Sequence, residues 1–254
     1  MNGANWSLKE EIRDYWSGRA ETFDQSRGHR IHDGAEANSW RRVMKAGLGD
    51  IAGKKILDLA CGTGEISRML LDLGAQVTGV DFAEPMLTRA KAKLARRDWV
   101  GMLGDAERLD TLQDATFDGA ITRHLAWTLT DPLAAYAAIF RVLKPGARLL
   151  IIDGDWVSET PRTRVLRGIA KLIDGKEGQV GADAERHKRI LSQVPYANGL
   201  TPDRLRADLQ AAGFADVTRH STLAVYLWGM RGAGLGDQLR LLAPTRFAIS
   251  AKRP

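Results

Sequence analysis

The stretch LDLACGTGEIS, residues 57–67, decides the fold of this 254-residue chain. It continues an apolar run that begins at Ile56, and its second half opens a pattern with helical spacing. Between the two lie Ala60, Gly62 and Gly64, which let the backbone turn sharply and approach a ligand closely. A glycine-rich turn that joins a strand to a helix is typical of a nucleotide-binding loop. The question is which nucleotide this loop holds.

Short apolar segments alternate with helical patterns on both sides of this loop. Helices are expected over residues 65–73, 85–94, 132–143 and 201–213, and the Lys-Pro-Gly run at 144–146 is expected to end the third. The segments expected to be strands are 55–60, 75–81, 99–105, 117–123, 147–153, 214–220 and 245–253. Strands separated by helices of this length imply right-handed crossovers. The predicted fold is therefore α/β, a doubly wound, mostly parallel, Rossmann-like sheet of seven strands with helices on both faces, whose last strand inserts antiparallel beside 214–220.

Two regions outside this alternation are expected to be helical. At the N-terminus, Ser7 and Glu10 form a capping-box pattern ahead of an apolar helical face, and a second helix is expected at 40–47. The polar, basic segment after the fifth strand is interpreted as an inserted helical segment or lid. The predicted divisions are an N-terminal helical cap (1–48), a ligand-binding core (49–155), the insertion (156–200) and the C-terminal part of the core sheet (201–254).

Composition excludes several classes of protein. Hydrophobic residues make up 44% and charged residues 27% of the chain, as in ordinary globular enzymes. The single cysteine, Cys61, excludes a disulfide framework and favours a cytoplasmic setting. No apolar run approaches a membrane span, so membrane insertion is not expected. The net charge of +6 is compatible with nucleic-acid binding, but acids interleave with the basic residues, so nucleic acid is an unlikely partner.

The loop fits a dinucleotide dehydrogenase poorly. The positions that a G-x-G-x-x-G fingerprint would occupy hold Ala60, Gly62, Gly64 and Ser67. No tyrosine is followed four residues later by lysine, so the commonest short-chain reductase pair is absent from the sequence. A dehydrogenase and a purely structural tight turn are therefore minor alternatives.

Four motifs occur in order around the loop: ILDLACGTG from Ile56, GVDFAEPML from Gly79, GDAERL from Gly104 and RVLKPGARLLI from Arg141. Together they resemble the class I S-adenosylmethionine-dependent methyltransferases, in the small-molecule branch similar to UbiE-like and type-11-like enzymes. YWSGRAETFD, from Tyr15, resembles the helix that such enzymes fold over the cofactor.

This resemblance implies S-adenosyl-L-methionine as methyl donor and S-adenosyl-L-homocysteine as product. It implies transfer of the methyl group to an O or N atom of a small-molecule acceptor by in-line displacement. The core at 49–155 would be the cofactor-binding part of the chain. No metal is expected, because no cluster of His, Asp and Glu has convincing ligand spacing.

The cofactor carries a sulfonium cation, an amino-acid end, a ribose diol and an adenine, so acids and small residues suit it better than Lys or Arg. Asp81 is expected to accept hydrogen bonds from both ribose hydroxyls. Asp105 is expected to accept from the adenine amino group, with Phe82 and Met86 on the faces of the ring, and the resemblance places Asp58 near the methionine end. The predicted cofactor-binding residues are Tyr15, Arg19, Phe23, Asp58, Ala60, Cys61, Gly62, Gly64, Asp81, Phe82, Met86, Gly104, Asp105, Ala106, Glu107 and Arg123.

Several of these residues have a second interpretation. Met86 fits helix-to-sheet packing nearly as well, and Glu107 fits a solvated acid at a helix start equally well. Trp16 and Phe23 fit a permanently docked amphipathic helix as well as they fit a closing lid. Asp81 also fits a helix cap, though less well.

The carboxyl end of the fourth strand is where a doubly wound sheet opens toward its ligand. His124 is the candidate catalytic base there, because a pKa near neutrality suits it to remove a proton from a hydroxyl or amine. The alternative is that His124 is hydrogen-bonded to the backbone and only shapes the cleft. The candidate acceptor-binding residues are Trp16, Trp127, Asp153, Asp155 and Trp156. The alternative for the two acids and the last two indoles is a polar turn with packing tryptophans.

Two functions from other classes stay open. One is an RNA methyltransferase, with the basic residues of 156–200 near the phosphates. The other is a non-catalytic, methyltransferase-like partner protein. Acids at 174, 177, 183 and 185 interleave with the arginines and favour a solvated helix face. A homodimer is compatible with the sequence.

Overall fold

The structure, a computed structural model, describes residues 7–25, 28–175 and 182–254. The strands in these residues are β1 (Lys55–Leu59), β2 (Gln76–Asp81), β3 (Trp99–Leu103), β4 (Phe117–Arg123), β5 (Leu143–Asp155), β6 (Ala215–His220) and β7 (Thr245–Lys252). They form one sheet in the order β3-β2-β1-β4-β5-β7-β6. The pairs among β1 to β5 are parallel, whereas β7 is antiparallel to both β5 and β6. The predicted fold class and the antiparallel last strand are confirmed.

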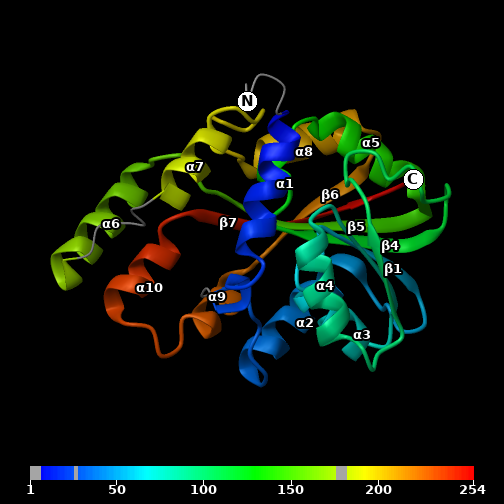
Figure 1. Cartoon of the computed structure of the whole chain (residues 1–254), viewed down its shortest axis with the longest axis horizontal. Coiled ribbons are helices and arrows are strands. Elements are labelled where there is room, and N and C mark those ends of the chain that lie inside the picture. Colours follow the sequence, from blue (N-terminus) through cyan, green and yellow to red (C-terminus); the bar gives the residue numbers. More distant parts are fainter. Residues whose placement is uncertain (1–6, 26–27, 176–181) are drawn as a thin grey trace, which may run out of the picture.

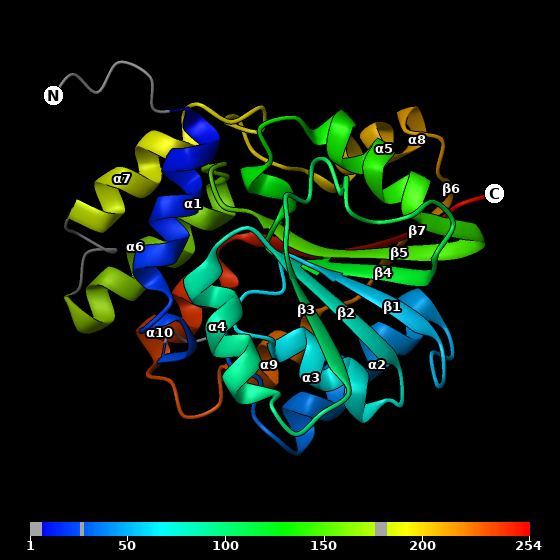
Figure 2. The same cartoon turned by 45° about the vertical axis from the view of Figure 1, so that its right-hand side comes forward.

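Helices cover both faces of this sheet and one of its ends. The helices of the described residues are α1 (Leu8–Arg19), α2 (Ala35–Leu48), α3 (Glu65–Asp72), α4 (Glu84–Lys93), α5 (Pro132–Val142), α6 (Pro161–Asp174), α7 (Ala182–Leu191), α8 (Pro202–Ala211), α9 (Leu223–Gly229) and α10 (Leu235–Leu242). Helices α5 and α8 lie on one face and α2 and α3 on the other, while α1, α6, α7 and α10 gather beyond one end of the strands (Figure 1). Figure 2 shows the same layers from a second direction.

Two apolar cores hold the layers together because the strands are buried on both faces. Along β5, Leu149 and Ile151 face one core with α5 and α8, while Leu150 and Ile152 face the other with α2 and α3. This alternation follows from the two-residue period of a strand. In α2, a Cβ on Gly47 would lie 2.6 Å from Leu150, so only glycine lets this helix approach the sheet so closely.

The structure differs from the prediction at three places. Helix α2 begins at Ala35 rather than near residue 40, because packing and not a side-chain cap starts it: Gly34 makes no capping bond. Strand β5 begins at Leu143, and the Lys-Pro-Gly run lies in its irregular first part. Helices α9 and α10 were not predicted, since neither has a side-chain hydrogen bond at its N-cap.

Parts of two predicted regions lie outside the described residues: 1–6 and 26–27 of the cap, and 176–181 of the insertion. The described part of the insertion contains α6 and α7. Over 7–25, 28–175 and 182–254, no helix has both the length and the apolar character needed to span a bilayer.

Candidate functional site

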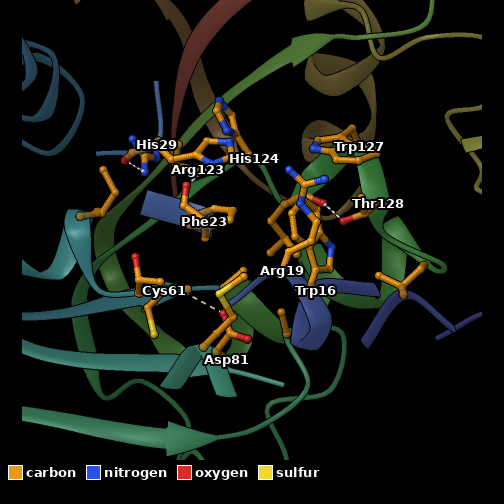
Figure 3. Close-up of a pocket in the computed structure, with 18 of the residues that line it drawn as sticks. Trp16, Arg19, Phe23, His29, Cys61, Asp81, Arg123, His124, Trp127 and Thr128 are labelled. Atoms are coloured by element: carbon orange, nitrogen blue, oxygen red, sulfur yellow. Dashed lines mark hydrogen bonds between the residues drawn. The ribbon is translucent and has the colours of Figure 1, made fainter. Parts of the chain in front are cut away.

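A cavity of about 590 Å³ lies where the strand order reverses between β1 and β4. In open α/β sheets this switch point is the usual ligand position, and the volume is within the range of small-molecule sites. The loop after β1, the ends of β2, β3 and β4, and helix α1 all contribute to its lining. Figure 3 shows Asp81 and Cys61 on one side of the cavity and Arg123 and His124 on the opposite side.

The cavity brings together most of the predicted site residues. Those that line it are Tyr15, Trp16, Arg19, Phe23, Asp58, Ala60, Cys61, Gly62, Asp81, Phe82, Met86, Gly104, Asp105, Ala106, Glu107, Arg123, His124, Trp127 and Trp156. Gly64, Asp153 and Asp155 are not among the lining residues. Met86 also packs in an apolar cluster, so its two interpretations are compatible.

The three residues outside the lining have structural contacts instead. Gly64 is the N-cap of α3 at a φ of +83°, and a Cβ there would lie 3.1 Å from Leu94 and 3.2 Å from Ala90. Asp155 accepts hydrogen bonds from the backbone N–H groups of residues 157 and 158. Asp153 is fully buried, and its Oδ1 accepts from Gly154 N–H and from the Trp156 indole at 3.2 Å. These contacts favour the alternative of a polar turn, and contact of the two acids with an acceptor amine stays a prediction.

The glycine-rich loop presents its backbone to the cavity. Ala60 and Gly62 have φ angles of +51° and +53°. A Cβ on Gly62 would meet only Phe23 across the cavity, at 3.8 Å. Both oxygens of Asp81 are fixed by backbone donors, Oδ2 by Gly62 N–H and Oδ1 by Ala83 N–H, each at 2.8 Å. Burial raises the pKa of Asp81 to about 6, against the lowering effect of these bonds.

Asp58 is a buried acid at the same end of the sheet. It lies within β1, inside the strand predicted over 55–60, and its Oδ2 accepts from the Ser67 hydroxyl at 2.7 Å. Burial raises its pKa to about 7, more than the bond from Ser67 lowers it. Asp58 is therefore a carboxyl at the cavity wall that can bind a proton near neutral pH.

Asp58 should make the stability of the protein depend on pH. Its pKa is about 7 in the folded state and 3.8 in the reference state, so the folded chain holds the proton more tightly. Its contribution to the free energy of unfolding is therefore complete below pH 3.8 and lost as the pH rises to about 7. We expect Asp58→Asn to flatten the decline between pH 5 and 7 in urea unfolding curves. The same change at exposed Asp203 should leave the slope as in the parent, and an unchanged slope in Asp58→Asn would contradict this prediction.

The acids after β3 are held by a residue that the sequence analysis did not single out. Lys9 of α1 lies 2.8 Å from Asp105 Oδ2 and 2.5 Å from Glu107 Oε2. Glu107 is 8% exposed and also accepts from the Thr130 N–H at 2.6 Å, so its interpretation as a solvated acid is wrong. The pKa of Lys9 is raised by these two carboxylates, although desolvation, the largest single influence, acts against them. Lys9 thereby ties α1 to the β3 end of the cavity.

Removing this tie should loosen α1 more than it destabilises the fold. We expect Lys9→Met to speed hydrogen exchange over residues 8–19, while the free energy of unfolding changes by less than about 1 kcal/mol, because the ion pairs are partly exposed. Lys45→Met, on α2, is the matched control and should leave exchange in α1 unchanged. Exchange in Lys9→Met that equals the parent would show that apolar contacts alone seat the helix.

Aromatic side chains form the wall above the loop. The Trp16 ring centroid lies 6.0 Å from that of Phe23 and 6.2 Å from that of Trp127, both edge-on. Tyr15 Oη lies 3.1 Å from His187 of α7 and accepts from Arg19. Helix α7 is joined to α1 by ion pairs, Arg186 with Asp14 and Arg189 with Glu11. These two arginines of the insertion are thus paired with α1.

The opposite side of the cavity holds buried nitrogen groups. His124 has a φ of +62°, and its Nε2 is buried with no hydrogen-bond partner among the described residues. Burial, and then the charge of Arg123, lower its pKa well below the ordinary value, so the expected pKa near neutrality is wrong. Arg123 is partly buried and donates to the carbonyl oxygen of His29 at 2.7 Å. His29 stacks on Phe23 at 4.0 Å, and burial lowers its pKa to about 4.

Four lining residues that matter here were missed in the sequence: Lys9, His29, Tyr226 and Arg246. Lys9 lies in the predicted N-terminal helix, and His29 lies between the two helices predicted at the N-terminus. Tyr226 and Arg246 lie in α9 and β7, far along the chain from every motif. No local signal marks them, since only the sheet topology brings them to the cavity. Across the described part of the chain, no group of three His, Cys, Asp or Glu side chains is arranged to hold a metal ion.

Comparison with known proteins gives the same class. Residues 57–151 match the family described as methyltransferase domain. Demethylmenaquinone methyltransferase of Thermus thermophilus is 32% identical over 216 residues, which cover 81% of this chain and 91% of that protein. The ubiquinone/menaquinone biosynthesis C-methyltransferase UbiE of Desulfotalea psychrophila is 38% identical over 118 residues, covering 45% of this chain and 47% of the relative. In that second match the chain spans about half the length of the curated relative.

Solved structures share the fold at low sequence identity. Phosphoethanolamine N-methyltransferase 2 of Haemonchus contortus superposes with a TM-score of 0.66 at 15% identity, over 98% of this chain and 60% of that one. The [4+2]-cyclase SpnF gives a TM-score of 0.62 at 17% identity, over 98% and 97%. The sheet order and the acid-lined loop thus define a class I methyltransferase fold. Proteins that catalyse different reactions share this fold. The chain belongs to the class I S-adenosylmethionine-dependent methyltransferases, in their UbiE-like branch.

Proposed function

We propose that this chain binds S-adenosyl-L-methionine in the cavity and transfers its methyl group to a small-molecule acceptor. One observation carries the proposal: acids at the ends of three adjacent strands, Asp58, Asp81 and Asp105, surround a loop that presents backbone rather than side chains. A donor with a ribose diol, an amino group and a cation, but no phosphate, is the ligand that this set of acceptors suits.

The lining residues have distinct parts in holding this cofactor. Asp81 is placed to accept from the ribose hydroxyls with its remaining lone pairs, because both of its oxygens are already oriented by backbone donors. Asp105 and the backbone of Ala106, which line the cavity, are proposed to bind the adenine edge, with Phe82 and Met86 beside the ring. When bound, the cofactor supplies a methyl group that its sulfonium has already activated.

The rest of the chemistry is alignment and exclusion of water. The wall of Trp16, Phe23 and Trp127 shields the reactive end, which favours an in-line displacement. His124 is the candidate base: burial lowers its pKa, which keeps the imidazole neutral with a free lone pair but makes it a weaker base than a histidine with an ordinary pKa. The accepting atom is proposed to be oxygen or nitrogen. A relative named C-methyltransferase makes carbon the second candidate.

Two other functions are less well supported. An RNA substrate needs free cations on the insertion, but Arg186 and Arg189 are paired with acids of α1. A role without methyl transfer is compatible with the fold, since the [4+2]-cyclase SpnF shares it. The single cysteine is in keeping with a reducing, cytoplasmic setting.

Calorimetry measures binding of the cofactor, and a labelled methyl donor measures transfer of the methyl group. We expect S-adenosylhomocysteine to bind with micromolar affinity and NAD not to bind. Tritium from the methyl group of S-adenosylmethionine should then appear in a small-molecule fraction of a metabolite extract and not in added RNA. Binding without transfer to either would favour the non-catalytic role, and the site of label on the product, read by NMR, distinguishes O, N and C.

A further inference from the structure

The end of the cavity opposite Asp81 holds buried donors that lack partners. The side chains there come from four places: Arg123 and His124 after β4, Trp156 after β5, Tyr226 on α9 and Arg246 at the start of β7. Arg246 pairs in register with Gly154 at the far end of β5, which brings it to the same edge of the sheet as His124. Three atoms of this cluster are buried with no hydrogen-bond partner among the described residues: His124 Nε2, Tyr226 Oη and Arg246 Nε.

Arg246 is the most costly of these groups to leave unpaired. Its guanidinium carbon lies 4.2 Å from the Tyr226 ring centroid and 5.2 Å from the Trp156 ring centroid. Over 7–25, 28–175 and 182–254, neither Arg246 nor Arg123 forms an ion pair with a carboxylate. Arg246 is partly buried and its Nε is fully covered, and a cation in such a position without a counter-ion carries a desolvation penalty, which an anion at the site would offset.

Asp58, Glu65 and Asp237 do not supply that counter-ion, because each already has a partner. Asp58 accepts from Ser67, and Glu65 pairs with Lys93 and Arg68. Asp237 lines the cavity, but it lies 3.5 Å from Arg240, which also pairs with Asp174. Adding the cationic sulfonium of the methyl donor to this end would increase the excess of positive charge.

Resting on the proposed function, we propose that the methyl acceptor carries an anionic oxygen group, a carboxylate or a phosphate, which binds Arg246 and the Tyr226 hydroxyl. The edge-on rings of Trp156 and His124, 5.2 Å apart, border this subsite and favour an aromatic body for the same molecule. The anion neutralises Arg246 and leaves the body of the acceptor beside His124. Arg123, which also lines the cavity and donates to the carbonyl oxygen of His29, adds to the positive charge at this end.

Matched probes test the subsite without knowledge of the true acceptor. Binding of 2-naphthoate, 2-naphthyl phosphate and the neutral 2-naphthamide is measured by calorimetry on protein saturated with S-adenosylhomocysteine. We expect at least one anion to bind about 10-fold more tightly than the amide, since hydrogen bonds to charged groups are the stronger ones. The two anions distinguish a carboxylate from a phosphate subsite. Equal affinity of all three probes, or no binding of either anion, would overturn the proposal.

Variants test whether Arg246 and Tyr226 cause the preference for anionic probes. Arg246→Met should abolish the preference for the anion, and Tyr226→Phe should weaken it about 3-fold while the ring is kept. Arg206→Met, the same change at an exposed position of α8, should bind the probes like the parent. A preference that persists in Arg246→Met would place the anion elsewhere and contradict the proposal.

A stability measurement separates ligand binding from a structural role. Without ligand, Arg246→Met should unfold at a temperature equal to or above that of the parent, because an apolar group replaces an unpaired, partly buried charge. A structural arginine would instead lower the unfolding temperature. Failure of S-adenosylhomocysteine to bind the parent would refute the proposed function itself, whereas cofactor binding without anion preference refutes only the subsite.

Discussion

Asp81→Ala is expected to lower the affinity for S-adenosylhomocysteine about 100-fold or more, because two charge-assisted hydrogen bonds to the ribose would be lost together. The variant also loses the acceptor that orients the Gly62 and Ala83 N–H groups, so the loop itself would be less well fixed. Calorimetry of the parent and the variant measures the ratio directly.

Two further variants separate the charge of Asp81 from its shape. Asp81→Asn keeps one oxygen acceptor and should lose about 10-fold in affinity, since only the charge-assisted part is removed. Asp203→Ala, an exposed acid of α8, should bind like the parent. A change of less than threefold in Asp81→Ala would falsify the placement of the ribose at this carboxylate.

His124→Ala should reduce kcat about 100-fold and leave cofactor affinity within about twofold of the parent, which is the behaviour of a general base. The measurement is the rate of tritium transfer to whichever acceptor the extract reveals. His124→Asn is expected to fold better than His124→Ala, because asparagine tolerates the φ of +62°. Asparagine also has no titrating nitrogen. His32→Ala, at an exposed site, is the control.

The pH profile gives a second test of His124. Burial and the neighbouring Arg123 lower its pKa well below its ordinary value, so the imidazole is already neutral where a free histidine still titrates. The kcat of the parent should therefore show no histidine ionisation between pH 6 and 8. A rise in kcat centred near pH 6.5 that disappears in His124→Asn would contradict the buried, neutral state.

The cofactor end of the site was predictable because its residues sit in short motifs. Asp81 and Gly62 lie at the ends of neighbouring strands, and strand ends of a parallel sheet meet at one edge. The same reasoning placed Arg123 and His124 at the cavity. It misjudged the pKa of His124, because desolvation depends on every element packed around the ring.

The acceptor end was not predictable from local pattern. Asp153 and Asp155 lie at the end of β5, where a ligand acid would lie, but one oxygen of each accepts from backbone N–H groups of residues 154 to 158. Arg246 has no such position in the sequence pattern, and only the pairing of β7 with β5 brings it to the cavity. The pairing of Lys9 with Asp105, 96 positions apart, likewise appears only once α1 is docked.

The reversed direction of β7 has a consequence for how such proteins diversify. Had this strand run with its neighbours, Arg246 would lie at the opposite edge of the molecule, remote from the donor. Because β7 runs antiparallel to β5, Arg246 reaches the cavity without any change to the cofactor motifs. Exchanging the segment from α9 through β7 between relatives should therefore transfer the preference for the methyl acceptor. Binding of the ribose and adenine of the cofactor should stay unchanged.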